Sequence, residues 1–229
     1  MNYDELLGLV KARRSIRRFK PDPIPQEYID KIIEMARWAP SGFNQQPWEF
    51  VVIKKPELKN KIIEYCREQL LLSHKIDPSG KTSNSQPQTN TEQGDYRIAP
   101  VFILLLGDHR TIEDLPIATQ YGPDYLNNTF NAGLTCAFLY MQLAASTLGL
   151  ASQWLSAVQA PYEHFMIKEL LGIPKYLIVY NLMVLGFPAS APRSKIMREK
   201  DEMVHYDYCG PEAFRTDEEV LEFIRKTRS

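Results

Sequence analysis

The sequence predicts one globular domain in which α-helices and β-strands share a core. The chain has 229 residues, 44% of them hydrophobic, which is enough to bury a substantial interior. Residues 48–53 (WEFVVI) and 101–106 (VFILLL) have the aliphatic and aromatic content of buried strands. Residues 125–162 contain no Asp, Glu, Lys or Arg, in a protein that is 24% charged. This stretch is predicted to hold the central helix.

Apolar residues in that stretch recur at steps of three and four along one helix face: Leu134, Phe138, Met141, Ala145 and Leu148. The other faces are mostly apolar too, and a helix that is apolar all round is buried all round. A membrane span over residues 132–151 is the alternative, but polar side chains interrupt it and no Lys/Arg-rich flank adjoins it. Because one domain of this size has few places to enclose such a helix, we expect a second subunit to cover part of it, giving a homodimer.

Charge and cysteine content exclude several classes of protein. The balance of 27 Lys and Arg against 28 Asp and Glu gives no global field for nucleic acid or acidic membranes. The three cysteines, Cys66, Cys136 and Cys209, form no C-x-x-C pair, and their odd number indicates reduced thiols. The N-terminus lacks the basic start and apolar run of a signal peptide. We therefore expect a cytoplasmic protein with no metal site and no membrane or nucleic-acid partner.

The first helix is predicted at residues 3–13, and it runs into a basic segment. In residues 11–20 (KARRSIRRFK) six of the ten side chains are cationic, and Ile16 and Phe19 are interleaved as apolar anchors. Three prolines then forbid helix and give an extended turn. A second helix is predicted at residues 26–38.

A solvated charged face is the simplest interpretation of these six cations. A nucleic-acid patch fits poorly, because Ser15, Ile16 and Phe19 interrupt the run and no second basic stripe supports it. A phosphate site fits better, since arginine forks match phosphate oxygens and the Ser15 hydroxyl adds a donor.

The loop at residues 39–48 (APSGFNQQPW) follows the second helix. Pro40 and Gly42 favour a rigid turn. Four of its side chains are uncharged hydrogen-bonding groups: Ser41, Asn44, Gln45 and Gln46. Such groups suit a planar heterocycle with imide and ring-nitrogen edges, although an ordinary polar turn is the alternative.

Taken together, the two segments resemble the nitroreductase superfamily of flavoenzymes. Its members carry an Arg-[Arg/His]-Ser-x-[Arg/Lys] start followed by an Ala-Pro-Ser-x-x-Asn-x-Gln-Pro-Trp loop. Here the first motif is Arg13-Arg14-Ser15-Ile16-Arg17, the second spans residues 39–48, and the match continues to about Lys195. The resemblance implies an α+β fold, a three-layer sandwich with a central, mostly antiparallel sheet flanked by helices. It also implies an intertwined homodimer that holds two FMN molecules at the subunit interface.

The resemblance assigns cofactor-binding roles to residues of both motifs. The first motif would hold the FMN phosphate, ribityl chain and pyrimidine edge, with Arg14 contributing its backbone: Arg13, Arg14, Ser15 and Arg17. The loop would reach the flavin of the partner chain: Pro40, Ser41, Gly42, Asn44 and Gln46. A cation such as Arg17 at the pyrimidine end would stabilise the reduced, anionic flavin.

The remaining helices are expected at 56–72, at 161–171 and from Thr216 onward, and a further strand at 177–185. Loops are expected at 73–96 and at 111–124, the second with a short helical turn as an option. Residues 151–156 are expected to form a loop or a short strand. Residues 73–96 are too polar to build a core and are interpreted as an active-site lid. Thr216 and Glu219 have the spacing of a capping box. The whole chain, 1–229, is taken as one FMN-binding domain, whose extension at 201–229 would pack on the partner subunit by the same resemblance.

Further site residues follow from the resemblance. Trp154, Leu155 and Ser156 would line the flavin, with the backbone amide of Leu155 or Ser156 facing the reactive flavin nitrogen. Arg193 and Lys195 would form a second phosphate clamp that meets Arg13. Possible walls of the substrate pocket are Phe43, Tyr121 and Tyr125. No side chain is assigned as catalytic, since the chemistry would belong to the flavin.

The predicted function is an FMN-dependent oxidoreductase working by a ping-pong mechanism. NAD(P)H would reduce the flavin, and a nitroaromatic, quinone or activated alkene would then accept two electrons. No G-x-G-x-x-G, H-E-x-x-H, G-x-S-x-G or P-loop motif is present. Within the same superfamily, a flavin-destroying synthase of the cobalamin lower ligand and an iodotyrosine-type reductive dehalogenase remain alternatives. A non-catalytic FMN-binding or redox-sensing protein is an alternative of another class.

Overall fold

The computed structural model describes residues 2–76, 96–113, 118–192 and 195–228. The chain divides into two compact units, Met1–Pro192 and Arg193–Ser229. Each unit has its own elements.

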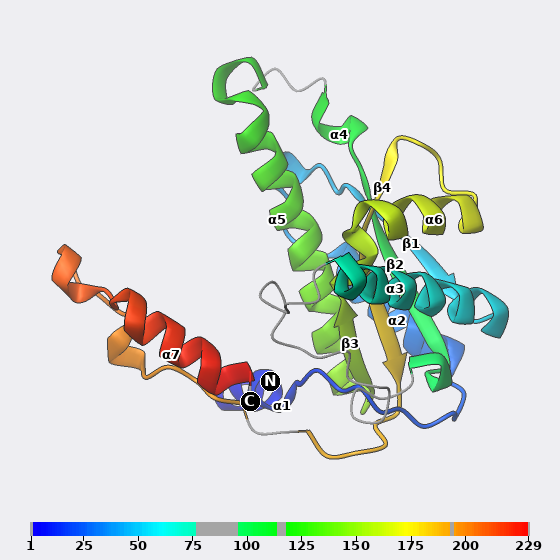
Figure 1. Ribbon diagram of the computed structural model, residues 1–229, viewed down its shortest axis with the longest axis horizontal. Coiled ribbons are helices and arrows are strands. Elements are labelled where there is room, and N and C mark those ends of the chain that lie inside the picture. Colours follow the sequence, from blue (N-terminus) through cyan, green and yellow to red (C-terminus); the bar gives the residue numbers. More distant parts are fainter. Residues whose placement is uncertain (1, 77–95, 114–117, 193–194, 229) are drawn as a thin grey trace. The chain divides into compact units, whose positions relative to one another are not determined.

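A four-stranded sheet lies at the centre of the first unit (Figure 1). Its strands are β1 (Trp48–Ile53), β2 (Val101–Asp108), β3 (Ala151–Leu155) and β4 (Leu177–Gly186). Their order is β1-β2-β4-β3, and each neighbouring pair is antiparallel. The three predicted strands are confirmed, and the segment at 151–156, which the sequence left open, forms the short edge strand β3.

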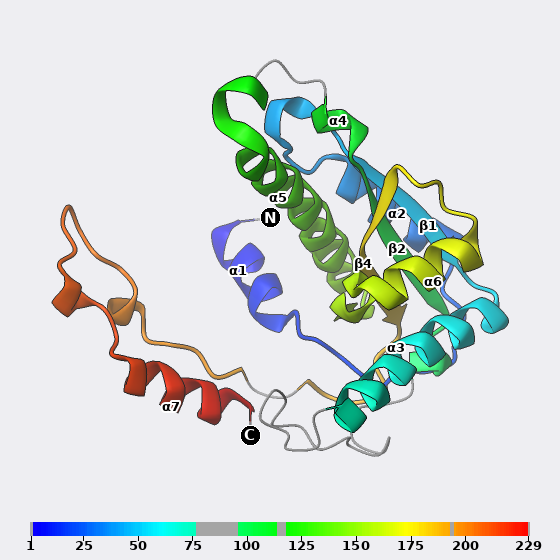
Figure 2. The same cartoon turned by 45° about the horizontal axis from the view of Figure 1, so that its top comes forward.

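Helices cover both faces of this sheet (Figures 1 and 2). α2 (Gln26–Arg37) and α5 (Ala118–Thr147) pack on one face, while α3 (Pro56–Ile76) and α6 (Pro161–Leu171) pack on the other. α1 (Tyr3–Ala12) contacts α5. The prediction of an α+β fold with the sheet between two helical layers is therefore confirmed.

Side chains alternate between the two faces along the central strand β2. Ile103 and Leu105 join the buried cluster that contains α2 and α5, whereas Phe102 and Leu104 join the cluster that contains α3 and α6. Gly107 lets α5 approach the strand closely, because a Cβ atom there would lie 2.5 Å from Cζ of Phe130. The near-continuous apolar run of β2 thus reflects burial on both faces.

The segment 111–124, predicted as a loop with a short helical turn as an option, contains such a turn, and its loop ends earlier than predicted because α5 begins before residue 124. α4 (Arg110–Glu113) begins there because the Asp108 side chain accepts a hydrogen bond from the Arg110 backbone N–H at 3.1 Å. α5 starts at Ala118 and passes a non-helical residue, Gly122 (φ 74°, ψ 172°). Among the described residues, no helix combines the length and apolar content that a membrane crossing requires.

α3 ends later than predicted, at Ile76 rather than at residue 72. Its last four residues, 73–76, contain no Gly or Pro, so nothing in them ends the helix. The rest of the predicted lid, residues 77–95, lies outside the described residues. The lid therefore stays a prediction.

The second unit contains α7 (Asp217–Arg228). The predicted capping box is confirmed: the Thr216 backbone N–H donates to Oε2 of Glu219 at 2.8 Å, and the Glu219 N–H donates to Oγ1 of Thr216 at 3.3 Å. Two 3₁₀ turns, Lys200–Glu202 and Pro211–Ala213, precede the helix.

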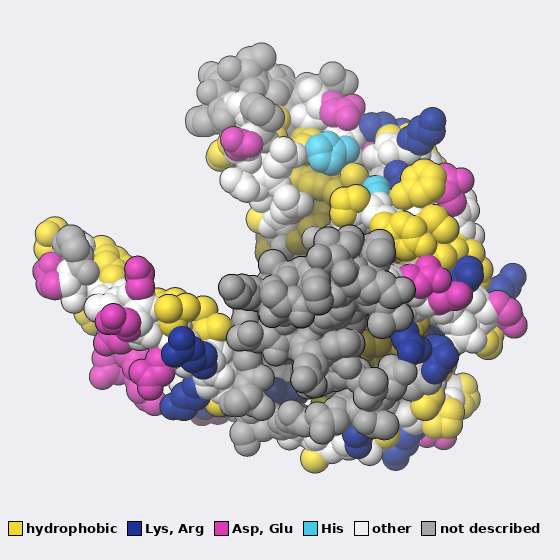
Figure 3. Space-filling view, in the orientation of Figure 1, with side chains coloured by type: hydrophobic (Ala, Val, Ile, Leu, Met, Phe, Trp, Pro, Cys, Tyr) yellow, Lys and Arg dark blue, Asp and Glu magenta, His cyan; other side chains and the backbone are white. Residues whose placement is uncertain are grey.

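Several apolar side chains of the first unit are exposed. α1 buries none of its side chains, and on α5 Tyr125 and Leu139 are 41% and 42% exposed. A further group lies on and beside α6, where apolar side chains gather on the face shown in Figure 3: Tyr162, Phe165 and Tyr176. The chain by itself therefore leaves part of α5 exposed, as expected if a second subunit covers that part.

Candidate cofactor site

The basic segment is held in extended form along the edge of the sheet. The Ile16 N–H donates to the Ser152 carbonyl of β3 at 3.1 Å, next to a parallel bridge between Ser15 and Ser152. Ile16 and Phe19 are both buried, as the predicted anchors require. The cationic side chains between and around the anchors are consequently directed away from the core.

Arg13 and Arg14 differ in what their guanidinium groups contact. Nη1 of Arg14 donates to the carbonyls of Lys11 and Arg13, at 2.5 and 3.0 Å. Burial, and then the charge of Arg14, lower the pKa of Arg13. Among the described residues, no carboxylate forms an ion pair with Arg13. A half-buried cation of this kind suits an external anion, whereas the Arg14 side chain is engaged at the end of α1.

Arg17 contacts a residue that sequence reasoning missed. Tyr96 opens the 3₁₀ turn Tyr96–Ile98, directly before β2. Burial raises the pKa of the Tyr96 hydroxyl, and a hydrogen bond and the positive charge from Arg17 act in the opposite direction. The signal available in the sequence was that Tyr96 is the first Phe, Trp or Tyr after the polar stretch at 73–95.

The loop between α2 and β1 has an unusual backbone. Phe43, Asn44 and Gln46 have φ values of 54°, 53° and 48°. This left-handed conformation costs a non-glycine residue roughly 1–2 kcal/mol. Apart from these three, Asp207 is the one described non-glycine residue with positive φ. Such strain gathers at ligand sites, where the surrounding structure holds it in place.

Hydrogen bonds within the loop maintain that conformation. Oγ of Ser41 accepts from the Gln46 N–H at 3.0 Å, and the Ser41 carbonyl accepts from the Asn44 N–H at 3.1 Å. The side-chain amide of Gln45 is enclosed and has no hydrogen-bond partner among the described residues. Some polar groups of the loop therefore stabilise the loop's own conformation, and Ser41 accepts two of these hydrogen bonds.

The end of β3 lies beyond the bridge to the basic segment. The ring of Trp154 packs on Phe138 of α5, with ring centroids 4.4 Å apart. The side chain of Leu155 is half-buried and that of Ser156 is exposed. Ser156 opens the 3₁₀ turn Ser156–Gln159, so its N–H has no acceptor within that turn.

The β-bridge therefore brings Arg13, Ser15 and Arg17 to the strand that leads to Trp154, Leu155 and Ser156. The loop residues Pro40, Ser41, Gly42, Asn44 and Gln46 are held separately, against α5. Phe43 is 54% exposed and Tyr125 41% exposed. Arg193 and the side chain of Tyr121 lie outside the described residues, and Lys195 is an exposed residue of the second unit.

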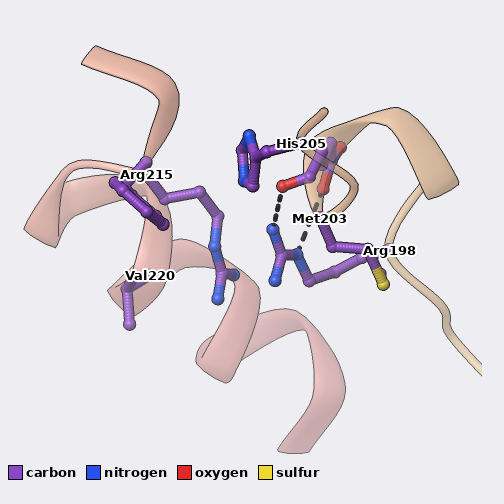
Figure 4. A pocket seen from close by; sticks show the side chains of 7 residues that line it. Arg198, Met203, His205, Arg215 and Val220 are labelled. Carbon is purple, nitrogen blue, oxygen red and sulfur yellow. Dashed lines mark hydrogen bonds and ion pairs between the residues drawn. The ribbon is translucent and has the colours of Figure 1, made fainter. Parts of the chain in front are cut away.

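The second unit contains a cavity of about 340 Å³ that the sequence did not indicate (Figure 4). Two arginines, a glutamate, a histidine and three apolar side chains line it: Arg198, Arg215, Glu202, His205, Met203, Phe214 and Val220. Nη2 of Arg198 donates to the Glu202 carbonyl at 2.5 Å, so this arginine is already engaged within the unit. In the part of the chain that the structure describes, no three His, Cys, Asp or Glu residues form a group able to hold a metal ion.

Known proteins match most of the chain. The sequence model of the Nitroreductase family matches residues 10–187, a range that includes both motifs. A protein of Methanothermobacter thermautotrophicus, provisionally named NADH dehydrogenase/NAD(P)H nitroreductase, is 26% identical over 199 residues, or 87% of this chain and 85% of that protein.

Two further comparisons bear on activity and fold. Iodotyrosine deiodinase 1 of Rattus norvegicus is 29% identical over 192 residues, which are 82% of this chain; the chain spans 64% of that relative's length. The structure of the NADPH:FMN oxidoreductase from Vibrio harveyi complexed with NAD+ superposes with a TM-score of 0.69 at 19% identity, over 97% of this chain and 84% of that one. At this identity the superposition is evidence of a shared fold.

Proposed function

Because the chain belongs to the nitroreductase family, we propose that this oxidoreductase uses FMN to transfer two electrons from NAD(P)H to an organic acceptor in a ping-pong cycle. The acceptor classes are nitroaromatics, quinones and activated alkenes. When bound, FMN supplies the redox chemistry, while the chain binds and orients it.

One observation carries this proposal: the basic segment is bonded to β3 just before the strand reaches Leu155 and Ser156. Arg13 is half-buried and has no carboxylate partner in the described part of the chain, which is the character of a phosphate ligand. We propose that Lys195 forms a second clamp on the same phosphate. Arg193 is included on the basis of its place in the sequence alone. Because the N–H of Ser156 has no acceptor within its 3₁₀ turn, Ser156 is proposed ahead of Leu155 as the donor to the reactive flavin nitrogen.

Arg17 is proposed to lie at the pyrimidine end of the flavin. Negative charge develops there on reduction, and a nearby guanidinium stabilises it. The Tyr96 hydroxyl, which interacts with Arg17, would help to orient this guanidinium without neutralising its charge. The loop 40–46 would complete the site from a second subunit, and the exposed apolar side chains of α1 and α5 support such a homodimer.

Purified protein tests the proposal directly. We expect it to bind FMN with a flavin absorption spectrum, and anaerobic NADH or NADPH to bleach that spectrum before any acceptor is added. Protein that binds no FMN would contradict the proposal. Bound FMN that neither nucleotide reduces would favour a non-catalytic flavin protein.

Reductive dehalogenation is the second candidate, favoured by the match to an iodotyrosine deiodinase over 82% of this chain. Iodide release from iodotyrosine by the chemically reduced flavoprotein is the discriminating measurement. Nitroaromatic or quinone turnover without iodide release supports the first candidate. Cleavage of the flavin itself during aerobic incubation would instead identify a lower-ligand synthase.

A further inference from the structure

Two glycines mark places where the loop and α5 approach more closely than side chains allow. A Cβ atom on Gly42 would lie 1.9 Å from Cγ2 of Thr129, and a Cβ on Gly133 would lie 3.1 Å from Cβ of Ser41. Thr129 and Gly133 are four residues apart in α5, so they occupy adjacent turns on one helix face. The loop thus lies directly on this face at two points.

Neither glycine is required by its own backbone. Gly42 and Gly133 are absent from the described glycines with positive φ, which are Gly122, Gly149 and Gly172. Glycine within a helix also destabilises it relative to alanine. The close approach of the loop is therefore the physical reason for both residues.

The Thr129 side chain is fixed in the orientation that makes this contact. Its Oγ1 donates to the Tyr125 carbonyl at 2.9 Å, one turn earlier in α5. That hydrogen bond leaves Cγ2 directed at Gly42. The threonine therefore offers a methyl group of fixed position rather than a flexible surface.

We propose that Thr129 and Gly133 are positioning residues that form a seat for the strained loop and so set the geometry of the flavin site. The inference rests on the proposed binding of FMN by the loop. The seat acts through Gly42 and Ser41, and Ser41 in turn holds the Gln46 N–H at 3.0 Å. The seat would also explain the left-handed conformation of Phe43, Asn44 and Gln46. If the α5 surface excludes other conformations of the loop, it stabilises φ values that these residues disfavour by themselves.

The decisive experiment is a rescue. Gly42→Ala places a methyl group against Thr129, and we expect the FMN Kd to rise by about 10- to 100-fold, because small misplacements of a binding group cost that much. Adding Thr129→Ser removes Cγ2 but keeps the hydroxyl. The nearest remaining atom is then Thr129 Cβ at 3.4 Å, an ordinary contact, so the double variant should recover most of the FMN affinity.

Gly133→Ala should weaken FMN binding less than Gly42→Ala does, and it should do so without destabilising the fold. The alanine raises helix propensity, so the free energy of unfolding should not fall, while the displaced Ser41 should raise the FMN Kd about three- to tenfold. Gly8→Ala is the matched control, since it also replaces a helical glycine but has nothing within 4 Å of the added Cβ. It should leave FMN affinity unchanged.

FMN affinity is measured by flavin fluorescence titration, and folding by urea denaturation of the FMN-free proteins. Wild-type protein that binds no FMN would overturn both the proposed function and the seat. If wild type binds FMN, two results overturn the seat alone. One is that Gly42→Ala binds as wild type does, and the other is that Thr129→Ser fails to restore affinity to a folded Gly42→Ala protein.

Discussion

The two segments that would bind FMN are built by different means. The basic segment is ordinary extended backbone, bonded to β3 through Ile16 and anchored by the buried Ile16 and Phe19 side chains. The loop at 41–46 has three left-handed non-glycine residues and rests on α5. The contrast indicates that ordinary extended backbone is enough to direct cationic side chains outward, whereas the left-handed residues of the loop need neighbouring elements to hold them.

Removing charge from the basic segment should have the largest effect on FMN binding. We expect Arg13→Ala to raise the FMN Kd by about 10- to 100-fold, since one hydrogen bond to a charged group contributes about 1.5–3 kcal/mol. Arg14→Ala is the control, because the Arg14 guanidinium is bonded to the Lys11 and Arg13 carbonyls. Equal losses in the two variants, measured by fluorescence titration, would remove the distinction between these arginines.

A smaller effect is expected at Tyr96. Tyr96→Phe removes the hydroxyl that contacts Arg17 and should raise the FMN Kd about fivefold, as expected from the loss of about 1 kcal/mol per hydrogen bond. The flavin reduction potential should also shift, because Arg17 would be less firmly placed. An unchanged potential together with unchanged affinity would show that Arg17 needs no support from Tyr96.

Relieving strain in the loop separates stability from binding. Phe43→Gly removes a left-handed non-glycine residue, and we expect the free energy of unfolding to rise by up to about 1 kcal/mol. The more flexible loop should bind FMN about two- to threefold more weakly, since ordering it on binding then costs entropy. Phe43→Ala removes the same ring without relieving φ, so it should show no such gain in urea denaturation.

A substitution on the opposite face of the sheet should leave FMN binding unchanged. Glu163 of α6 is 1% exposed, and burial raises the pKa of its carboxyl group. Its contribution to stability is therefore fully present below the unfolded-state pKa and declines as pH rises toward the folded-state pKa. Glu163→Gln should flatten this decline in urea denaturation above about pH 4.3. A changed FMN Kd would indicate coupling between the two faces.

The sequence predicted the framework and much of the charge placement. The bounds of α6, Pro161–Leu171, were predicted to the residue, because a proline at its start and Gly172 at its end are local signals. Ile16 and Phe19 were recognised as anchors from their apolar character within a basic run. Local sequence was sufficient to predict these features because each depends on the type of one or two residues and not on distant contacts.

Features that depend on packing could not be predicted. Phe43 and Gln46 have left-handed φ values, although neither residue type favours that conformation. Tyr96 was missed because its contact with Arg17 joins segments far apart in sequence. The start of α4 depends on Asp108, whose capping role required knowing that β2 continues past residue 106.

The attachment of the basic segment to β3 also affects solubility. β3 is an edge strand of the sheet, and unpaired strand edges are templates for pairing with other chains. The bridge at Ser15 and Ser152 covers part of that edge with a strongly cationic segment, which would repel a second molecule approaching in register. Deleting the N-terminal residues through Lys20 should therefore yield an aggregating protein, rather than a soluble one that has merely lost its cofactor.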